Sequence, residues 1–257
     1  SETQGKVRIE LCKRNWMDAF KRWKKRLTEA RDEQGISRAP YKGQWELMHA
    51  IHERCVQEAK EEQQARVNRD GREPARVCCH GLPGSGKTQV MKWMAEYFEE
   101  VWGWVAGRHY VYLAPMNSMA ARINGFTVHA RGEIPWCKSS VSENMTVRTG
   151  NSGSRDMSSM GSKTEVCRWI FIDEVEALGA EILGILEENM TEAARRKGYK
   201  FRGNVADPLR LRPVGGLNIC SYGDLWQLPP VMQVSISSNP FRMKANESHQ
   251  ARKIMKF

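Results

Sequence analysis

A glycine-rich segment in the first half of the chain constrains the fold more than any other feature. It consists of Gly81-Leu82-Pro83-Gly84-Ser85-Gly86-Lys87-Thr88. The spacing matches the pattern G-x-x-x-x-G-K-[ST] in the context that this pattern requires, with an apolar strand-like run before it and a helical pattern after it. Because such a loop joins a strand to a helix in a parallel sheet, the segment predicts an α/β fold with a phosphate-binding loop.

The residues of this loop have separate expected roles. The glycines allow consecutive backbone N–H groups to turn toward phosphate oxygens, and the following helix directs the positive end of its dipole at the same anion. The expected phosphate contacts are Gly81, Gly84, Ser85 and Gly86. We expect Lys87 to bridge the terminal phosphates and the Thr88 hydroxyl to ligate Mg²⁺. A glycine-rich turn that matches by chance is the alternative, which the flanking elements disfavour.

Two adjacent carboxylates form the second candidate element. Asp173 and Glu174 follow the apolar run at residues 169–172, and parallel sheets bind ligands at the carboxyl ends of their strands. We expect Asp173 to hold Mg²⁺, directly or through water, and Glu174 to orient and deprotonate an attacking water. The pair alone could be only a solvated loop start, but together with the phosphate loop it predicts a nucleoside triphosphatase.

The third element follows a strand-like run at residues 217–222 and consists of Gly223-Asp224-Leu225-Trp226-Gln227-Leu228-Pro229-Pro230-Val231. An acid and an amide at a strand end, followed by two rigid prolines, suit a sensor of bound nucleotide. We expect Gln227 to hydrogen-bond to the γ-phosphate or its water and Asp224 to lie in the nucleotide site. A proline-rich turn is the alternative. The run resembles the G-D-x-x-Q-L-P-P-V motif of the Pif (petite-integration-frequency) and RecD-like helicases of superfamily one.

This resemblance covers residues 44–231 and implies a fold, an activity and partners. The implied fold is a P-loop NTPase with a RecA-like parallel sheet and helices on both faces, here preceded by a basic helical extension. The implied activity is ATP- and Mg²⁺-dependent unwinding of DNA from five-prime to three-prime, with single-stranded DNA and duplex junctions as partners. Roles in DNA repair, recombination and telomere maintenance are implied by the resemblance alone.

Further site residues are assigned only through the resemblance. Gln44 is similar to the family's glutamine that reads the adenine edge, although a plain helix-start glutamine is the alternative. Residues 113–129 resemble the family's segment A-P-T-G-x-A-A…I-x-G-x-T-x-H, which contacts single-stranded DNA. The implied DNA contacts are Pro115, Asn117, Ser118, Thr127 and His129. The chain departs from this pattern because Met116 and Asn117 replace the usual Thr-Gly.

A second departure follows the two carboxylates. The family usually continues with a small or apolar residue, Ser and then Met, whereas this chain has Val175 and Glu176. The family also has a second RecA-like lobe whose arginines reach the γ-phosphate, and we find no such arginine context before Phe257. We therefore expect a fragment that binds nucleotide and hydrolyses it poorly, since an arginine finger contributes about 10³ to 10⁵ to turnover.

The predicted organisation has three parts. Residues 1–40 form a basic helical extension, residues 41–235 the ATP-binding domain, and residues 236–257 a basic tail that leads to the missing lobe. Ser, Gly, Asn and Thr dominate residues 138–163, which we expect to be a mobile loop. The predicted strands are 76–79, 110–113, 169–172 and 217–222. The predicted helices are 11–31, 44–69, 87–101 and 177–196.

Charge and cysteines give weaker indications. The net charge of +10 suits nucleic-acid binding, but residues 32–194 contain only 18 Lys or Arg against 23 Asp or Glu, so the excess lies at the ends. In the helix at 11–31, an aromatic stripe that packs on the body is favoured over DNA contact. The seven cysteines have no C-x-x-C spacing, which indicates a reducing compartment. No apolar run is long enough for a membrane span, and we expect the nucleus or another DNA-containing compartment.

Two other functional classes stay open from the sequence. A P-loop ATPase that remodels proteins or acts as a switch would share the first two elements, but it leaves residues 223–231 unexplained. A non-catalytic relic of a mobile-element helicase would bind DNA or partners through its basic ends. In that case the substitution Lys87→Ala would change nothing measurable. The oligomeric state is not predicted.

Overall fold

The computed structural model describes residues 15–63, 74–134, 158–196, 213–224, 226–227, 230, 233–236 and 238. The predicted loop residues 138–157 and nearly all of the predicted basic tail lie outside this set, as do residues 1–14. No helix among the described residues combines the length and the apolar character that crossing a membrane requires.

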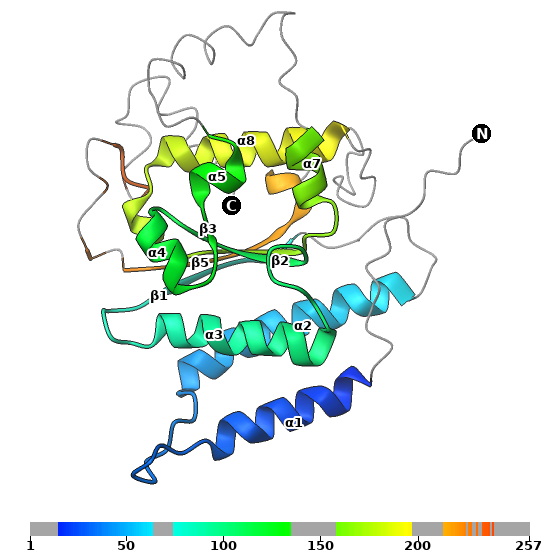
Figure 1. Cartoon of the computed structure of the whole chain (residues 1–257), viewed down its shortest axis with the longest axis vertical. Helices are drawn as coiled ribbons and strands as arrows, with labels where there is room; N and C mark the ends of the chain where they lie inside the picture. The colour runs from blue at the N-terminus through cyan, green and yellow to red at the C-terminus, as the bar shows by residue number, and fades with distance from the viewer. Residues whose placement is uncertain are drawn as a thin grey trace, which may run out of the picture.

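A parallel sheet forms the centre of the molecule (Figure 1). Its strands are β1 (Arg76–His80), β2 (Tyr110–Ala114), β3 (Phe126–Thr127), β4 (Trp169–Ile172) and β5 (Asn218–Gly223). They are ordered β1-β5-β4-β2-β3, and every pair is parallel. The four predicted strands are confirmed to within one residue. Because all strands run the same way, their carboxyl ends share one edge of the sheet.

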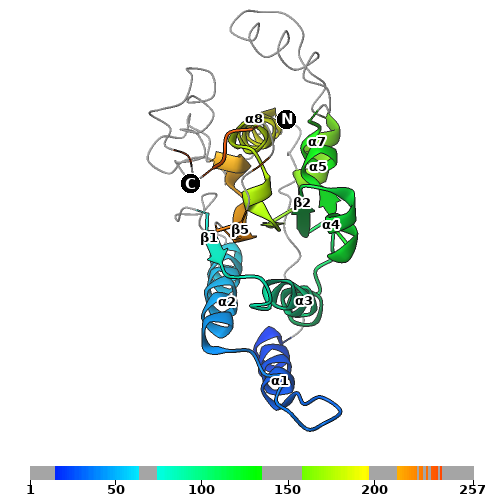
Figure 2. The same ribbon diagram turned by 90° about the vertical axis from the view of Figure 1, so that its left-hand side faces the viewer.

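One face of the sheet is covered by α2 (Lys42–Gln63), α3 (Lys87–Tyr97) and the π-helical turn η1 (Phe98–Trp102). Figure 2 shows α1 (Trp16–Glu29) as an outer layer beyond α2 and α3. A large aromatic cluster fills this side, and strand side chains such as Trp169 and Phe171 join it to the sheet. The predicted helix at 87–101 is therefore confirmed, although its last turn widens into a π-helix.

The α1 helix packs through its apolar stripe, as predicted. Ala19, Trp23 and Leu27 are buried. Arg26 on the same helix bridges to Glu96 and Glu100, with N–O distances of 2.8 and 2.7 Å. The packing interpretation of this basic helix is therefore confirmed for the residues that the structure describes.

The opposite face is covered by α5 (Val128–Gly132), α7 (Ser158–Thr164) and α8 (Ala180–Arg196). Helices thus lie on both faces, and the predicted fold class is confirmed. The predicted mobile loop is wrong at its end, because residues 158–163 belong to α7 and the Met160 side chain is buried in the core. The α8 helix begins at Ala180 rather than at residue 177, since a 3₁₀ turn, η2 (Val175–Ala177), precedes it.

Candidate nucleotide-binding site

The glycine-rich segment forms the connection between β1 and α3. Its first peptide is fixed to the end of β5, because the Gly81 N–H donates to the Gly223 carbonyl oxygen at 3.1 Å. Gly84 and Gly86 have φ angles of +77° and +82°, in the region that favours glycine. The loop therefore has the backbone freedom that a phosphate cradle needs, and it opens at the carboxyl edge of the sheet.

Lys87 lies across this loop. Its ammonium group donates to the carbonyl oxygens of Gly81, at 2.5 Å, and Leu82, at 3.2 Å. Thr88 is exposed in the first turn of α3. Both side chains expected to meet a nucleotide thus stand at the helix N-terminus, where the dipole is positive.

Gln44 is brought to the loop from the first turn of α2. Its side-chain amide donates to the Ser85 carbonyl oxygen at 3.2 Å, and its own carbonyl accepts from the Tyr41 N–H at 2.9 Å. A Cβ atom added to Gly86 would lie 2.6 Å from the Gln44 amide nitrogen. The position of Gln44 beside the loop suits its assigned role, and adenine recognition stays a prediction.

The carboxylate pair lies at the end of β4, two strands away from the loop. Asp173 is only 7% exposed, and its N–H donates to the Leu113 carbonyl oxygen on β2. Burial and then the Glu174 carboxyl raise the pKa of Asp173, while the nearby charges of Lys87 and Arg122 oppose this shift. Lys87 and Asp173 are therefore electrostatic neighbours although 86 positions separate them in the chain.

The backbone of Glu174 is left-handed, with φ 51° and ψ 47°. Such a conformation costs of order 1 kcal/mol or more for a residue other than glycine, and it is found most often at functional sites. It turns the chain sharply from β4 into η2. The predicted water-activating residue is thus held at a strained corner.

The sensor segment begins where β5 ends. Asp224 is 1% exposed, and its carboxylate accepts from the Trp226 N–H at 3.0 Å and from the Gln227 side-chain amide at 3.4 Å. The Gln227 N–H donates to the Asp224 carbonyl oxygen. Asp224 therefore shapes the turn that carries Gln227. Leu228, Pro229 and Val231 lie outside the described residues.

The donor set at this edge suits a hard divalent cation. Asp173 is a buried carboxyl beside a second carboxyl, and a divalent cation would relieve their repulsion. Mg²⁺ binds through one or two protein oxygens together with water and phosphate. The described residues contain no group of three or more His, Cys, Asp or Glu arranged for a metal. A Mg²⁺ site formed by Thr88 and Asp173 with water and phosphate does not require such a group.

The predicted DNA contacts differ in their exposure. Asn117 and Ser118 are exposed at the start of α4 (Asn117–Arg122). Pro115 is buried, as is Thr127, whose hydroxyl accepts from the Ala130 N–H at 3.1 Å and caps α5. Burial lowers the pKa of His129. Asn117 and Ser118 are thus the accessible members of the set, and DNA contact by all five stays a prediction.

Sequence reasoning gave no role to two charged groups at this edge. The charge of Arg122, on α4, opposes the rise in the pKa of Asp173. Glu176, in η2, is a buried acid next to Glu174. The only available signal for Glu176 was its departure from the family pattern.

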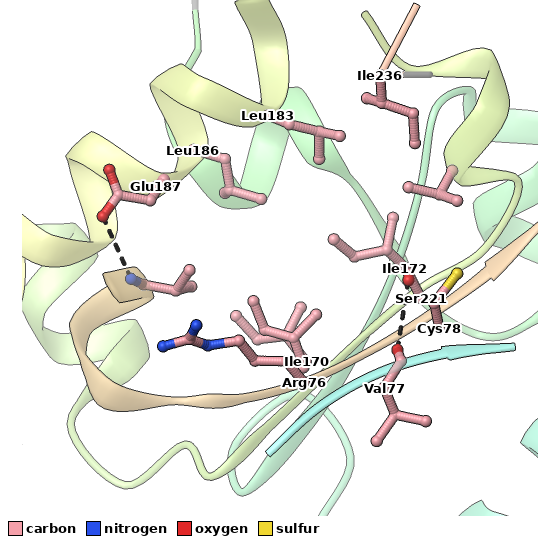
Figure 3. Close-up of a pocket in the computed structure, with 13 residues that line it drawn as sticks. Arg76, Val77, Cys78, Ile170, Ile172, Leu183, Leu186, Glu187, Ser221 and Ile236 are labelled. Carbon is pink, nitrogen blue, oxygen red and sulfur yellow. Dashed lines mark hydrogen bonds between the residues drawn. The ribbon is translucent and has the colours of Figure 1, made fainter. Parts of the chain in front are cut away.

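A separate apolar cavity of about 230 Å³ lies between α8 and the strands β1, β4 and β5 (Figure 3). Leu183 and Leu186 point into it from α8, and Ile170 and Ile172 point into it from β4. None of the predicted site residues lines this cavity.

Comparison with known proteins places the chain in a family. The profile of the PIF1-like helicase family matches residues 60–257. No curated protein matches. Among solved structures, unliganded Pif1 from Bacteroides sp. gives a TM-score of 0.47 at 18% identity, over 76% of this chain and 33% of that chain. Bacteroides Pif1 helicase in complex with ADP-AlF3 and ssDNA gives a TM-score of 0.43 at 20% identity, over 84% of this chain and 36% of that chain.

Pif1 helicase from Candida albicans gives a TM-score of 0.35 at 19% identity, over 68% of this chain and 33% of that chain. The chain spans about a third of the length of the solved structures that it matches. Since the family profile covers most of its residues, and the phosphate loop, carboxylate pair and sensor turn share one edge of the sheet, the chain belongs to the PIF1-like helicase family.

Proposed function

We propose that this chain is the ATP-binding motor lobe of a DNA helicase that unwinds DNA from five-prime to three-prime. The observation that carries the proposal is the meeting of three sequence elements at one edge of the sheet. The Gly81 N–H binds the end of the sensor strand, and the charge of Lys87 acts on Asp173. A site that combines an anion cradle, a buried carboxylate and an amide-bearing turn has the parts needed to hydrolyse a nucleoside triphosphate.

Each residue has a specific task in this proposal. Lys87 binds the terminal phosphates, and Thr88 and Asp173 hold Mg²⁺, which would neutralise charge on the phosphate oxygens. Glu174 accepts a proton from the attacking water. Gln227, in the turn after β5, hydrogen-bonds to the γ-phosphate or its water and so senses the bound nucleotide. Gln44 orients the adenine.

The DNA substrate is proposed from the family and from its solved members. The solved Pif1 structures include one from Bacteroides bound to ssDNA and another that addresses DNA unwinding at forked dsDNA. We infer that single-stranded DNA and duplex junctions are the partners of the whole protein, and that Asn117 and Ser118 take part in strand contact. Work in DNA repair, recombination and telomere maintenance, in a DNA-containing compartment, is part of the same proposal.

Nucleotide binding tests the proposal directly. The melting temperature of the chain should rise by several degrees with saturating Mg-ATP, because a ligand at about 100 times its Kd stabilises by about 2.7 kcal/mol. Lys87→Ala should remove this rise. The matched control is Lys92→Ala on the exposed side of the same helix, which should preserve it.

The outcomes separate the competing functions. A melting temperature that ignores Mg-ATP in the unsubstituted chain would reject the ATP-binding lobe and favour a non-catalytic relic. A full-length form whose ATP turnover is not stimulated by single-stranded DNA would favour a protein-remodelling ATPase. The family assignment argues against that class, because its members are grouped as helicases.

A further inference from the structure

The chain that follows the sensor turn returns to the start of α8. Gly179, directly before this helix, forms an isolated antiparallel bridge with Ser235. The Ala180 N–H, in the first position of α8, donates to the Val234 carbonyl oxygen at 2.8 Å. We call this contact between residues 179–180 and 233–235 the α8 bridge. It joins the chain after the sensor motif to the helix that follows the carboxylate pair.

Glycine at position 179 allows the two segments to approach. A Cβ atom added to Gly179 would collide with the Gln233 Oε1 atom and would lie 2.8 Å from the Gln233 Cβ atom. The φ angle of Gly179 is not in the left-handed region, so the close approach of Gln233, and not the backbone conformation, requires glycine here. The Gln233 Oε1 atom is buried and has no hydrogen-bond partner among the described residues. The Gln233 side chain therefore meets Gly179 by packing.

Apolar packing holds the α8 bridge in place on the side of the cavity. Ile236, one residue after the bridge, lines the apolar cavity together with Leu183 from α8 and Ile172 from β4 (Figure 3). Burial of these side chains stabilises the contact. Ile172 directly precedes Asp173, so the bridge is fixed to the same strand that carries the carboxylate pair.

The sensor segment is thus held at both of its ends. At the first end, the Gly223 carbonyl oxygen accepts from the Gly81 N–H, and the Asp224 carboxylate accepts from the Gln227 side-chain amide. At the second end lies the α8 bridge. Only five residues separate Gln227 from Gln233, and two of them are prolines, whose rings fix their φ angles. A displacement at the bridge is therefore passed on to Gln227.

We propose that Gly179 is a positioning residue, which closes the α8 bridge and so keeps Gln227 within hydrogen-bond reach of the γ-phosphate. The inference rests on the proposed function, in which Gln227 senses the bound nucleotide. The phosphate loop and Gln44 belong to other elements. Opening the bridge should therefore slow turnover and leave the binding of the rest of the nucleotide unchanged.

Gly179→Ala is the first test, because the added methyl group displaces Gln233. The kcat for Mg-ATP hydrolysis by this chain should fall about tenfold, while KM stays constant. The Kd for Mg-ADP, which lacks the γ-phosphate, should also stay constant, whereas a general distortion of the site would raise it. Gln227→Ala defines the rate without the sensor amide. The double variant Gly179→Ala/Gln227→Ala should be no slower than Gln227→Ala, since the bridge acts through Gln227.

A second substitution tests the steric cause. Gln233→Gly removes the atoms that an alanine at position 179 would meet. In the Gln233→Gly background, Gly179→Ala should therefore change kcat by less than about twofold. Glu181→Ala is the control, because it introduces an alanine at an exposed position in the first turn of α8 and should keep the kcat of the unsubstituted chain.

A further variant opens the bridge without adding bulk at Gly179. Ala180→Pro removes the N–H that donates to the Val234 carbonyl oxygen, and proline is well tolerated at the first position of a helix. Its kcat should fall at constant KM, as for Gly179→Ala. Melting temperatures show which variants are folded. If Gly179→Ala is not, Ala180→Pro decides.

The results distinguish this inference from the proposed function. A chain that fails to bind or to hydrolyse Mg-ATP overturns both. If the chain hydrolyses Mg-ATP and the folded bridge variants keep its kcat, only the role of the α8 bridge is overturned. An equal loss of kcat for Gly179→Ala in the Gln233→Gly background has the same meaning. So has a double variant slower than Gln227→Ala, or a higher KM at constant kcat, because each would place the effect outside Gln227.

Discussion

His52 shows how burial decides the protonation of a single side chain. Its ring stacks on Phe20 with centroids 3.7 Å apart and an interplanar angle of 6°. Its Nδ1 atom lies 2.7 Å from the Tyr97 hydroxyl oxygen, which also accepts from the Trp102 indole N–H. We assign Nδ1 as the acceptor of the Tyr97 proton. Burial, followed by the charges of His49 and Lys24, lowers the pKa of His52 to about 4.

This shift predicts acid sensitivity. A histidine with a lowered folded pKa binds its proton less readily than the unfolded chain does, so stability is lost as pH falls from about 6.5 toward about 4. His52→Phe retains an aromatic ring and cannot titrate. Its melting temperature should therefore lie below that of the unsubstituted chain at neutral pH, and the difference should shrink at about pH 4.5.

Thermal unfolding followed by circular dichroism at the two pH values checks this prediction. Phe20→Leu is the control, because it weakens the stack without removing a titrating group and should lower the melting temperature equally at both. Parallel pH dependence for His52→Phe and the unsubstituted chain would contradict the assignment.

At the scale of single residues, the sequence predicts the chemical role of a side chain better than it predicts which residues surround that side chain. The roles of Lys87 and Asp173 follow from motif spacing, and the structure makes the two side chains electrostatic neighbours. The burial of Glu176 depends on Gly223, which lies 47 positions further along the chain. No local pattern reports such a contact. Asp224 differs, because its carboxylate accepts from Trp226 and Gln227, which follow it directly in the turn.

At the scale of elements, α1 is joined to the molecule by aromatic packing more than by charge. Trp23 is 2% exposed, and its ring centroid lies 5.2 Å from that of Tyr97 and 6.1 Å from that of Trp45. The ion pairs of Arg26 are about half exposed, and such pairs contribute at most about 1 kcal/mol. Apolar burial therefore dominates the docking of this helix.

Trp23→Ala should accordingly destabilise the chain by about 3–5 kcal/mol, the usual cost of deleting a buried tryptophan. Lys25→Ala on the exposed side of the same helix, where the lysine side chain is 72% exposed, should change stability by less than about 0.5 kcal/mol. Urea unfolding measures both. A loss below about 1 kcal/mol for Trp23→Ala would show that α1 is an appendage.

The predictability of an element followed its length and its apolar character. The strand Trp169–Ile172 was predicted with its observed bounds, because four consecutive apolar residues precede two acids. The strand Phe126–Thr127 was missed, since two residues carry no periodicity. The short helices α4, α5 and α7 were missed for the same reason. The start of α8 shifted because the left-handed Glu174 inserts a 3₁₀ turn that sequence periodicity cannot reveal.

At the scale of the whole molecule, the helical layer with α1 and the sheet share one core. The same cluster of buried residues contains Trp23 from α1, Met48 from α2, Met94 from α3 and Trp169 from β4. Removing any one layer would expose the side chains of the others. The helices α1, α2 and α3 and the facing side of the sheet therefore share one continuous core, and we expect them to unfold together.

This continuity predicts one unfolding transition. Tryptophan fluorescence, to which Trp16, Trp23 and Trp45 contribute near α1, and far-ultraviolet circular dichroism, which reports all helices, should give the same urea midpoint and slope. The continuous core is the reason, since α1 cannot leave without opening it. A fluorescence transition at lower urea than the dichroism transition would show that the N-terminal layer unfolds first.

The position of β5 between β1 and β4 limits how a nucleotide signal can travel. Hydrogen-bond ladders fix this strand to β1 on one side and to β4 on the other, so it cannot slide past either neighbour without breaking several bonds at once. The strand is therefore held on both sides by its neighbours, and the chain leaves it at the turn after Gly223. We therefore expect a change at the phosphates to move the turn from Asp224 to Gln227 and to leave the strand itself in place.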